Sequence, residues 1–436
     1  MVNEERPDGA VHRGLHIGRL GLRLTGSYLG YQLQNLWFGD AGQAERRRRF
    51  HQKASHQVRE ELQLLKGPVM KLGQMLSMQG LVLPPEALEE LSALQMHAPG
   101  MHPTLARAQF KSSLGCEPEA VFREFEPEPF AAASLGQVHR AVTQAGDTVA
   151  VKIQYPAIRK AVQNDFRLLR SAAVGGQLTG HVPKALLDDE IETQIGLETD
   201  YVQEANNLDR FQEELRPLPF VHVPRVFHEF STDRVLTMSY LNGAHLGDWL
   251  ARKPSAALRS LVGSRLFELF YFQALRVCAL HADPHPGNYL FTGEGEIGLV
   301  DFGCVKEVVP AYGELVRIFL DQDRLSQEEK VDRLARLIWG ERPSRKQRGP
   351  RQAMMAALDL GRKICPPAHA KNAVVDFGDA SLFAGLARIA KEVLQNKLTR
   401  PEWVFIKRAE IGLYNLLHLL GARVNTVEVL RRLQNA

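Results

Sequence analysis

The stretch from His281 to Asn288, His-Ala-Asp-Pro-His-Pro-Gly-Asn, constrains the fold more than any other part of the chain. Two short apolar runs follow it, on either side of the turn-forming run 292–296, and predict a tight β-hairpin. Asn288 and Asp301 lie at equal distances from the expected turn centre, so strand pairing should bring them side by side. Carboxylate and amide oxygens are ligands that Mg²⁺ prefers, and Asp283 lies just upstream. The stretch therefore predicts a magnesium site that carries a phosphate chain.

The order of these residues also matches a known catalytic pattern. His-x-Asp-x-x-x-x-Asn, a hairpin and Asp-Phe-Gly are the catalytic loop and metal-binding segment of kinases. In that pattern Asp283 orients or deprotonates the acceptor, while Asn288 and Asp301 hold the metal. An alternative is a transition-metal site formed by His281, Asp283 and His285. Alternate residues of an extended loop point to opposite sides, which disfavours three convergent ligands.

A second group of candidate nucleotide-binding residues precedes this loop. The strand predicted at 148–154 carries Val-Ala-Val-Lys, and its Lys152 corresponds to the lysine that kinases direct at phosphates. Lys152 needs an acidic partner, which we assign to Glu204 in the helix predicted at 188–215. An acidic, solvated helix face is the alternative interpretation of Glu204. The candidate nucleotide contacts are Ala131, Ala132, Ala133, Ser134 and Gly136 of an alanine-rich loop, Lys152, and Met238 and Leu241 at an expected inter-lobe hinge.

The elements around the catalytic loop are predicted to be mainly helical. Strands at 223–230 and 234–240 lead to the hinge, and a long apolar helix at 261–280 delivers the catalytic loop. Further helices are predicted at 103–115, which ends in a glycine, and at 402–420.

The composition excludes several classes of protein. The 436 residues are 44% hydrophobic and 24% charged, which is typical of a folded globular protein with two or three packed units. The net charge of +4 is too small to indicate a nucleic-acid partner. The 4 cysteines show neither metal-site spacing nor disulfide density, as expected in a reducing compartment. We expect no signal peptide and no membrane-spanning run.

The amino-terminal region has an unusual charge pattern. Residues 11–39 combine many apolar side chains with Arg13, Arg19 and Arg23 and contain no acid, which predicts a basic amphipathic helix or helix pair. Arg46–Arg49 add consecutive positive charges. One interpretation is reversible contact with an anionic membrane surface. The other is packing on the protein's own body with a solvated basic face.

Together, these motifs resemble the UbiB family of atypical kinases, also called aarF-domain kinases, over roughly residues 67–306. The residues that carry the resemblance are Lys71-x-Gly73-Gln74, the loop 131–137, Glu198-x-Asp200 and the run from His281 to Asn288. The resemblance implies an α+β, two-lobed protein-kinase-like fold with a helical extension at 1–66, an N-lobe at 67–240 and a mainly helical C-lobe at 241–436. It also implies that Lys71 contacts the Glu198 and Asp200 motif, and that its helix regulates the site by lying where a protein substrate would dock.

The same resemblance implies a function. It predicts an ATP-dependent factor for ubiquinone biosynthesis that uses Mg²⁺ with ATP or ADP, is cytoplasmic and is peripherally associated with the inner membrane. Its implied partners are a polyprenyl lipid or quinone precursor, an anionic membrane surface and quinone-biosynthesis enzymes, and no nucleic acid. The segment after Asp-Phe-Gly lacks Ala-Pro-Glu and a long activation loop, which disfavours a peptide-substrate platform. The alternatives are a catalytically silent, nucleotide-gated scaffold that presents lipid, and a true protein kinase.

Overall fold

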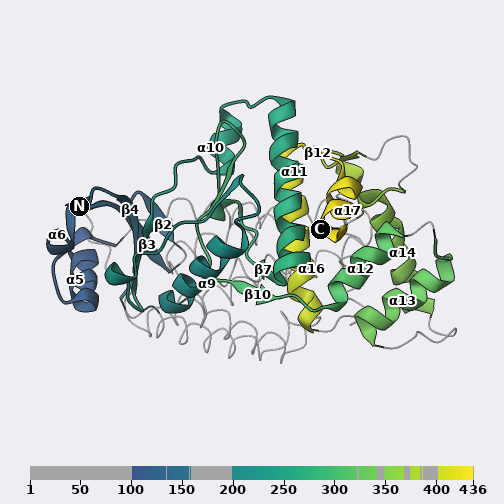
Figure 1. The fold of residues 1–436 in the computed structure, drawn as a ribbon, viewed down its shortest axis with the longest axis horizontal. Helices are drawn as coiled ribbons and strands as arrows, with labels where there is room; N and C mark the ends of the chain where they lie inside the picture. Colours follow the sequence, from purple (N-terminus) through teal and green to yellow (C-terminus); the bar gives the residue numbers. More distant parts are fainter. Residues whose placement is uncertain are drawn as a thin grey trace, which may run out of the picture. The chain divides into compact units, whose positions relative to one another are not determined.

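The computed structural model describes residues 101–133, 135–156, 158, 199–321, 324–340, 348–367, 374–382, 385 and 401–435 (Figure 1). The chain divides into two compact units, Met1–Val202 with Phe227–Met238 and Gln203–Val226 with Ser239–Ala436. The predicted domain boundaries at 66 and 240 stay predictions. The predicted basic segment and the helix carrying Lys71 lie outside the described residues.

The first unit is organised around a sheet with the strand order β1-β3-β4-β6, in which β2 also pairs with β3. The strands are β1 (Phe122–Phe125), β2 (Ala131–Ala133), β3 (Gly136–Thr143), β4 (Thr148–Gln154) and β6 (Val235–Ser239). Strands β3 and β4 pair antiparallel and place Val138 opposite Lys152. Gly146 in their connecting turn has φ 97°, a left-handed conformation that favours glycine. The strand predicted at 148–154 is confirmed.

Helix α5 (Pro103–Leu114) packs beside this sheet. Its sequence sets both ends, because Pro103 occupies the first turn and Gly115 ends the helix with φ 80°. A short helix, α6 (Pro118–Val121), leads into β1. The core of this unit consists of fully or almost fully buried apolar side chains. They include Ala106, Phe110, Phe122, Ala141, Val149, Val151, Ile153, Phe227 and Val235.

The second unit contains the short strands that frame the catalytic loop. Strand β7 (Ala279–His281) pairs antiparallel with β10 (Val305–Glu307). Strands β8 (Tyr289–Phe291) and β9 (Ile297–Leu299) form the predicted hairpin, and β5 (Val221–His222) pairs parallel with β9. The catalytic loop is therefore preceded by β7 and followed by β8, each of which is fixed by pairing with another strand.

Helices form most of the second unit. They are α9 (Tyr201–Glu214, whose first residues belong to the first unit), α10 (Leu246–Ala251), α11 (Ala256–Phe272), α12 (Ala311–Leu320), α13 (Gln327–Trp339), α14 (Arg348–Ile364), α16 (Pro401–Leu420) and α17 (Thr426–Asn435). Helix α11 packs against α16 and α17, and α11 and α16 lie side by side in Figure 1. A minor pair of strands, β11 (Val375–Asp376) and β12 (Arg423–Val424), lies near the end of the chain. The helix predicted at 402–420 is confirmed.

Two predicted elements are confirmed only in part. The helix predicted at 261–280 is helical as far as Val277, as α11 and then one π-helical turn, η2 (Gln273–Val277), but its last residues belong to β7. Pairing with β10 makes these last residues a strand. The strand predicted at 223–230 forms only around Val226, where Phe227 N donates to Thr237 O at 2.9 Å and Ser239 N donates to Arg225 O at 2.8 Å. It ends in a 3₁₀ turn, η1 (His228–Phe230), in which Phe230 N donates to Phe227 O at 3.0 Å.

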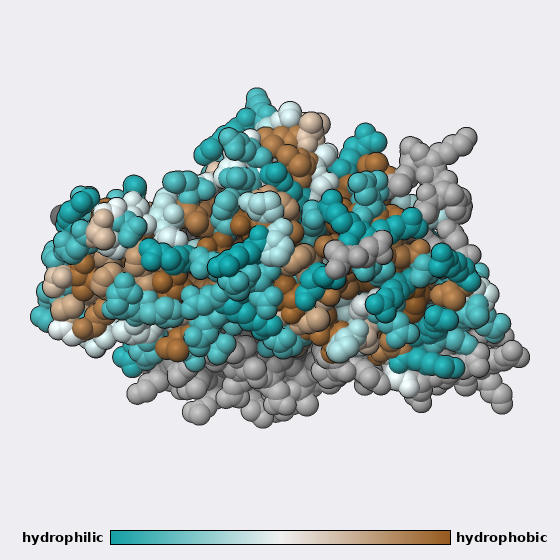
Figure 2. Space-filling model, in the orientation of Figure 1, coloured by the Kyte–Doolittle hydropathy of each residue, from teal (hydrophilic) through white to brown (hydrophobic). Residues whose placement is uncertain are grey.

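The face drawn in Figure 2 is mainly hydrophilic, with apolar residues in scattered patches. Large apolar side chains that are exposed include Leu105 of α5 and Leu261 of α11. Among the described residues, we find no helix with the length and apolar character needed to cross a membrane.

Candidate functional site

Asp283 and Asn288 are joined by hydrogen bonds within the catalytic loop. The Asn288 side-chain nitrogen donates to Asp283 Oδ2 at 3.0 Å and to the Asp283 carbonyl oxygen at 3.1 Å. Asn288 lies at the end of a 3₁₀ turn, η3 (Pro286–Asn288), which begins with a proline, and His285 Nδ1 caps this turn by accepting from Gly287 N at 3.0 Å. Asp283 is buried. The loop thus fixes two of the predicted site residues against each other.

The hairpin pairs its strands one residue out of the predicted register, so that Asp301 does not lie directly opposite Asn288. Tyr289 pairs with Leu299, and Val300 N donates to Asn288 O at 3.2 Å, so Val300 rather than Asp301 faces Asn288. The difference arises at the turn, where Gly295 with φ 78° closes a three-residue loop whose centre is a residue rather than a peptide bond. Asp301 follows immediately.

Backbone and side-chain contacts hold the Asp-Phe-Gly segment. Asp301 Oδ1 accepts from Gly303 N at 3.0 Å. Asn207 Nδ2 donates to Phe302 O at 2.9 Å, and Glu204 Oε1 accepts from Phe302 N at 3.4 Å. Asn207 and Glu204 are three residues apart on α9 and therefore share one face of that helix. Glu204 thus contacts the metal-binding segment directly, while its predicted pairing with Lys152 of the first unit stays a prediction.

His281 links the end of β7 to the same segment. Its Nε2 forms a hydrogen bond with the Asp301 carbonyl oxygen, so this nitrogen carries the proton, and its backbone N donates to Gln273 Oε1 at 2.8 Å. The ring lies edge-on to Phe302 with centroids 5.3 Å apart. His281 and His285 therefore contact backbone atoms, and the described part of the chain holds no group of three metal-binding side chains. This arrangement disfavours the transition-metal alternative.

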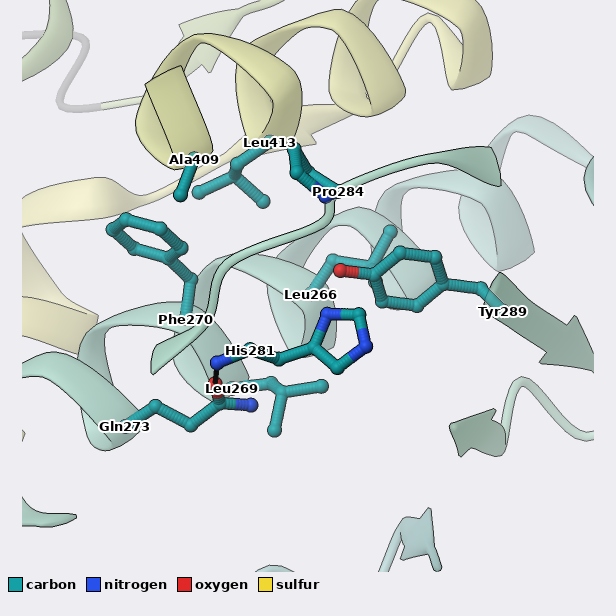
Figure 3. Close-up of a pocket in the computed structure, with 9 residues that line it drawn as sticks. All are labelled: Leu266, Leu269, Phe270, Gln273, His281, Pro284, Tyr289, Ala409 and Leu413. Carbon is teal, nitrogen blue, oxygen red and sulfur yellow. Dashed lines mark hydrogen bonds between the residues drawn. The ribbon is translucent and has the colours of Figure 1, made fainter. Parts of the chain in front are cut away.

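A small cavity lies beneath the catalytic loop, and Figure 3 shows its lining, with His281 and Tyr289 on one side and α16 on the other. The buried His281 Nδ1 has no hydrogen-bond partner within the described residues. Burial raises the pKa of the Tyr289 hydroxyl well above its ordinary value, and the Asp283 carboxylate raises it further. Tyr289 therefore remains neutral beside Asp283 at physiological pH.

Lys152 lies on β4 in the first unit and is 5% exposed. Its Nζ lies 5.1 Å from the centre of the Tyr201 ring, a cation–π contact. Gly136 is also buried near Tyr201. A Cβ at position 136 would overlap the Ile153 carbonyl oxygen and lie 2.9 Å from Tyr201 Oη. Close packing of β3 on its surroundings therefore requires a glycine at this position, whatever its role toward phosphates.

Some of the other predicted site residues lie in the described part of the chain, and the rest lie outside it. Ala131, Ala132 and Ala133 form β2, so this part of the alanine-rich loop is a strand paired with β3. Met238 is buried on β6, Leu241 is half-buried, and Asp200 Oδ1 accepts from Val202 N at 3.1 Å at the start of α9. Lys71, Gly73, Gln74, Ser134 and Glu198 lie outside the described residues, so the regulatory helix and its partner motif stay predictions.

Sequence reasoning missed two residues of the site, Asn207 and Gln273. Each supports the backbone of a catalytic segment from a helix. The sequence contained a signal for Gln273, which is a polar residue within a long apolar run. In the structure its side chain is 97% buried. Asn207 had no such signal, since asparagine on an otherwise polar helix is usually solvated.

Comparison with known proteins shows which family the chain belongs to. The model of the ABC1 atypical kinase-like domain matches residues 93–328, more than half of the chain. The chain belongs to this family. The predicted UbiB-type family and the predicted kinase-like α+β fold are thereby confirmed.

Relatives of this family member occur in plants and animals. "Protein ACTIVITY OF BC1 COMPLEX KINASE 7, chloroplastic" of Arabidopsis thaliana is 35% identical over 274 residues, which cover 62% of this chain and 39% of that protein. "AarF domain-containing protein kinase 1" of Mus musculus is 30% identical over 301 residues, covering 68% of this chain and 57% of that protein. The chain thus spans 39% and 57% of the length of these two curated relatives.

A solved structure agrees on the fold. The Rv3197–erythromycin complex from Mycobacterium tuberculosis is similar with a TM-score of 0.61 and 24% sequence identity, and the similarity covers 88% of this chain and 97% of that one. At this level of identity, the similarity concerns the fold alone.

Proposed function

We propose that this protein binds Mg²⁺ with ATP or ADP and catalyses ATP hydrolysis or phosphoryl transfer. The observation that carries the proposal is the hydrogen bond between Asn288 and Asp283, next to the hairpin that leads to Asp301. It joins the acceptor-orienting residue of the kinase pattern to one of its two metal ligands.

The donor set fits magnesium. The nitrogen of the Asn288 amide is used by Asp283, so the amide oxygen is the atom that would face a metal, and Asp301 supplies a carboxylate. Bound Mg²⁺ would neutralise charge on the phosphates. Asp283 would orient or deprotonate the acceptor hydroxyl or water. Lys152, held toward the phosphates by Glu204, would position the nucleotide, with Met238 and Leu241 beside the adenine.

The proposed biological role is support of ubiquinone, or polyprenyl quinone, biosynthesis. The family membership and its kinase-named relatives support an ATP-dependent role. The basic, apolar sequence at 11–49 supports peripheral contact with anionic lipid, and we propose a cytoplasmic protein at the inner membrane. The proposed partners are a polyprenyl lipid or quinone precursor and enzymes of quinone biosynthesis.

Magnesium-dependent ATP turnover by the purified protein, with and without anionic liposomes, tests this function. We expect turnover that rises with liposomes, because apolar insertion and arginine contacts would bring the site to its lipid substrate. The Asp301→Asn variant should lose it. No turnover above that of the variant under either condition would contradict the catalytic proposal and favour a nucleotide-gated, lipid-presenting scaffold.

A protein-kinase activity is tested separately. With radioactive ATP and a cell lysate, the wild-type protein should label no added protein. Labelling by the wild-type protein would contradict the proposed lipid-directed role. Labelling that appears only in Lys71→Ala would support the regulatory role of the Lys71 helix.

A further inference from the structure

Helix α16 lies directly against the catalytic loop. A Cβ at Gly412 would overlap the ring of Pro284 and lie 2.5 Å from its Cβ atom. Ala409 and Leu413 of the same helix line the cavity that His281 and Pro284 also line, and Figure 3 shows Leu413 beside the Pro284 ring. The helix backbone therefore approaches the residue next to Asp283 more closely than any side chain at position 412 would allow.

A buried polar cluster fixes the position of α16 along its axis. Glu410 Oε1 accepts from Tyr271 Oη of α11 at 2.9 Å, from Tyr312 Oη of α12 at 3.3 Å and from Tyr414 Oη at 3.0 Å. Lys407 Nζ donates to Glu410 Oε2 at 2.6 Å. We call these five residues the Glu410 cluster. Because its hydrogen bonds reach two other helices, α16 cannot slide or rotate without breaking them.

The Glu410 cluster retains a negative charge at its centre. Burial raises the pKa of the Glu410 carboxyl, but the Lys407 charge and the hydrogen bonds from Lys407, Tyr271 and Tyr414 lower it more, so the net shift is downward. The buried carboxylate is thereby ionised and accepts charge-assisted hydrogen bonds, which are stronger than neutral ones.

We propose that Gly412 is a positioning residue for the reaction. Helix α16, held in register by the Glu410 cluster, supports Pro284 and thereby sets the position of Asp283. This inference rests on the proposed function. Proline fixes its own φ and restricts the preceding residue, so a displaced Pro284 ring carries the Asp283 backbone with it. Displacements of about 1 Å at reacting groups cost on the order of 100-fold in rate.

The test compares Gly412→Ala with a matched variant, Gly361→Ala. The second substitution adds a methyl group to α14, where a Cβ would lie 2.5 Å from Phe319 Cδ1, away from the catalytic loop. We expect kcat for ATP turnover to fall at least about 10-fold in Gly412→Ala, with KM for ATP changed by less than about twofold. Gly361→Ala should keep kcat within about twofold of the wild-type value. A purely structural role for Gly412 would predict equal effects of the two substitutions on kcat.

Hydrogen exchange of the amides at 281–288 separates failure of this inference from failure of the proposed function. If the wild-type protein turns over ATP and Gly412→Ala retains kcat, the inference is wrong. If the wild-type protein shows no turnover, the proposed function fails, and exchange decides the inference. Faster exchange at 281–288 in Gly412→Ala than in Gly361→Ala supports it, and equal rates overturn it. If Gly412→Ala does not fold, Glu410→Gln is used in its place. We then expect kcat to fall more in Glu410→Gln than in Gly361→Ala, and exchange at 281–288 to be faster.

Discussion

The Asn288 side chain donates one hydrogen bond to the Asp283 carboxylate at 3.0 Å and another to the Asp283 backbone carbonyl at 3.1 Å. These bonds close a loop of six residues that contains two prolines, so its conformation is restricted before any ligand binds. The candidate acceptor-orienting residue and the candidate metal ligand therefore behave as one rigid unit. Such preorganisation lowers the cost of assembling a charged site around phosphate.

Asn288→Ala tests this unit. The substitution removes both hydrogen bonds to Asp283 and one candidate oxygen ligand of magnesium. We expect kcat for ATP turnover to fall by at least about 100-fold, because both positioning and charge stabilisation are lost. Steady-state kinetics with saturating Mg²⁺ measures it. A variant that keeps more than half of the wild-type kcat would remove Asn288 from the site.

Lys152→Met tests the role of the strand lysine in nucleotide binding. Methionine keeps most of the apolar stem but removes the ammonium group that lies over the Tyr201 ring. We expect the Kd for Mg-ATP to rise by at least about 10-fold, which corresponds to about 1.4 kcal/mol. Calorimetric titration measures it, and a thermal melt checks that the fold is kept. Unchanged affinity would assign Lys152 a structural role only.

Gly136→Ala tests the packing of the alanine-rich loop. The added methyl group would meet the Ile153 carbonyl oxygen and Tyr201 Oη, so we expect the free energy of unfolding to fall by about 1–3 kcal/mol. Gly247→Ala is the control, because a Cβ there meets nothing within 4 Å in α10, and we expect it to be neutral or slightly stabilising. Chemical denaturation measures both. Equal stabilities of the two variants would contradict the packing argument.

The Glu410 cluster predicts a pH dependence of stability. The folded-state pKa of Glu410 lies below its ordinary value of 4.5, so its contribution is complete above 4.5 and is lost as the pH falls through the folded-state pKa. We expect Glu410→Gln to be less stable than the wild-type protein by about 2 kcal/mol near neutral pH. The difference between the two unfolding free energies should shrink on acidification below 4.5. A difference independent of pH would show that the charge of Glu410 contributes nothing.

Local sequence signals predicted the elements whose ends and faces are set by neighbouring residues. Pro103 and Gly115 delimit α5, and the alternating pattern of 148–154 gives β4. The apolar run at 261–280 misled the prediction at its carboxyl end, because an apolar pattern does not distinguish a buried helix from a buried strand. Only pairing with β10 makes β7 a strand.

The candidate site was predictable to the extent that its residues lie on one loop and one hairpin. Asp283, Asn288 and Asp301 follow from their spacing, although an odd-length turn moved the pairing by one residue. Two supports of the site were not predictable, because they come from distant segments. Asn207 reaches Phe302 across 95 residues, and Gly412 meets Pro284 from a helix near the end of the chain.

The presence of a magnesium–nucleotide site is tested by calorimetric titration of ADP into the wild-type protein and into Asp301→Asn, with and without Mg²⁺. We expect Mg²⁺ to strengthen nucleotide binding by the wild-type protein and to have no effect on the variant, because Asp301 supplies the charged metal ligand. Equal strengthening in both proteins, or no nucleotide binding by the wild-type protein, would contradict a magnesium–nucleotide site at Asp283, Asn288 and Asp301.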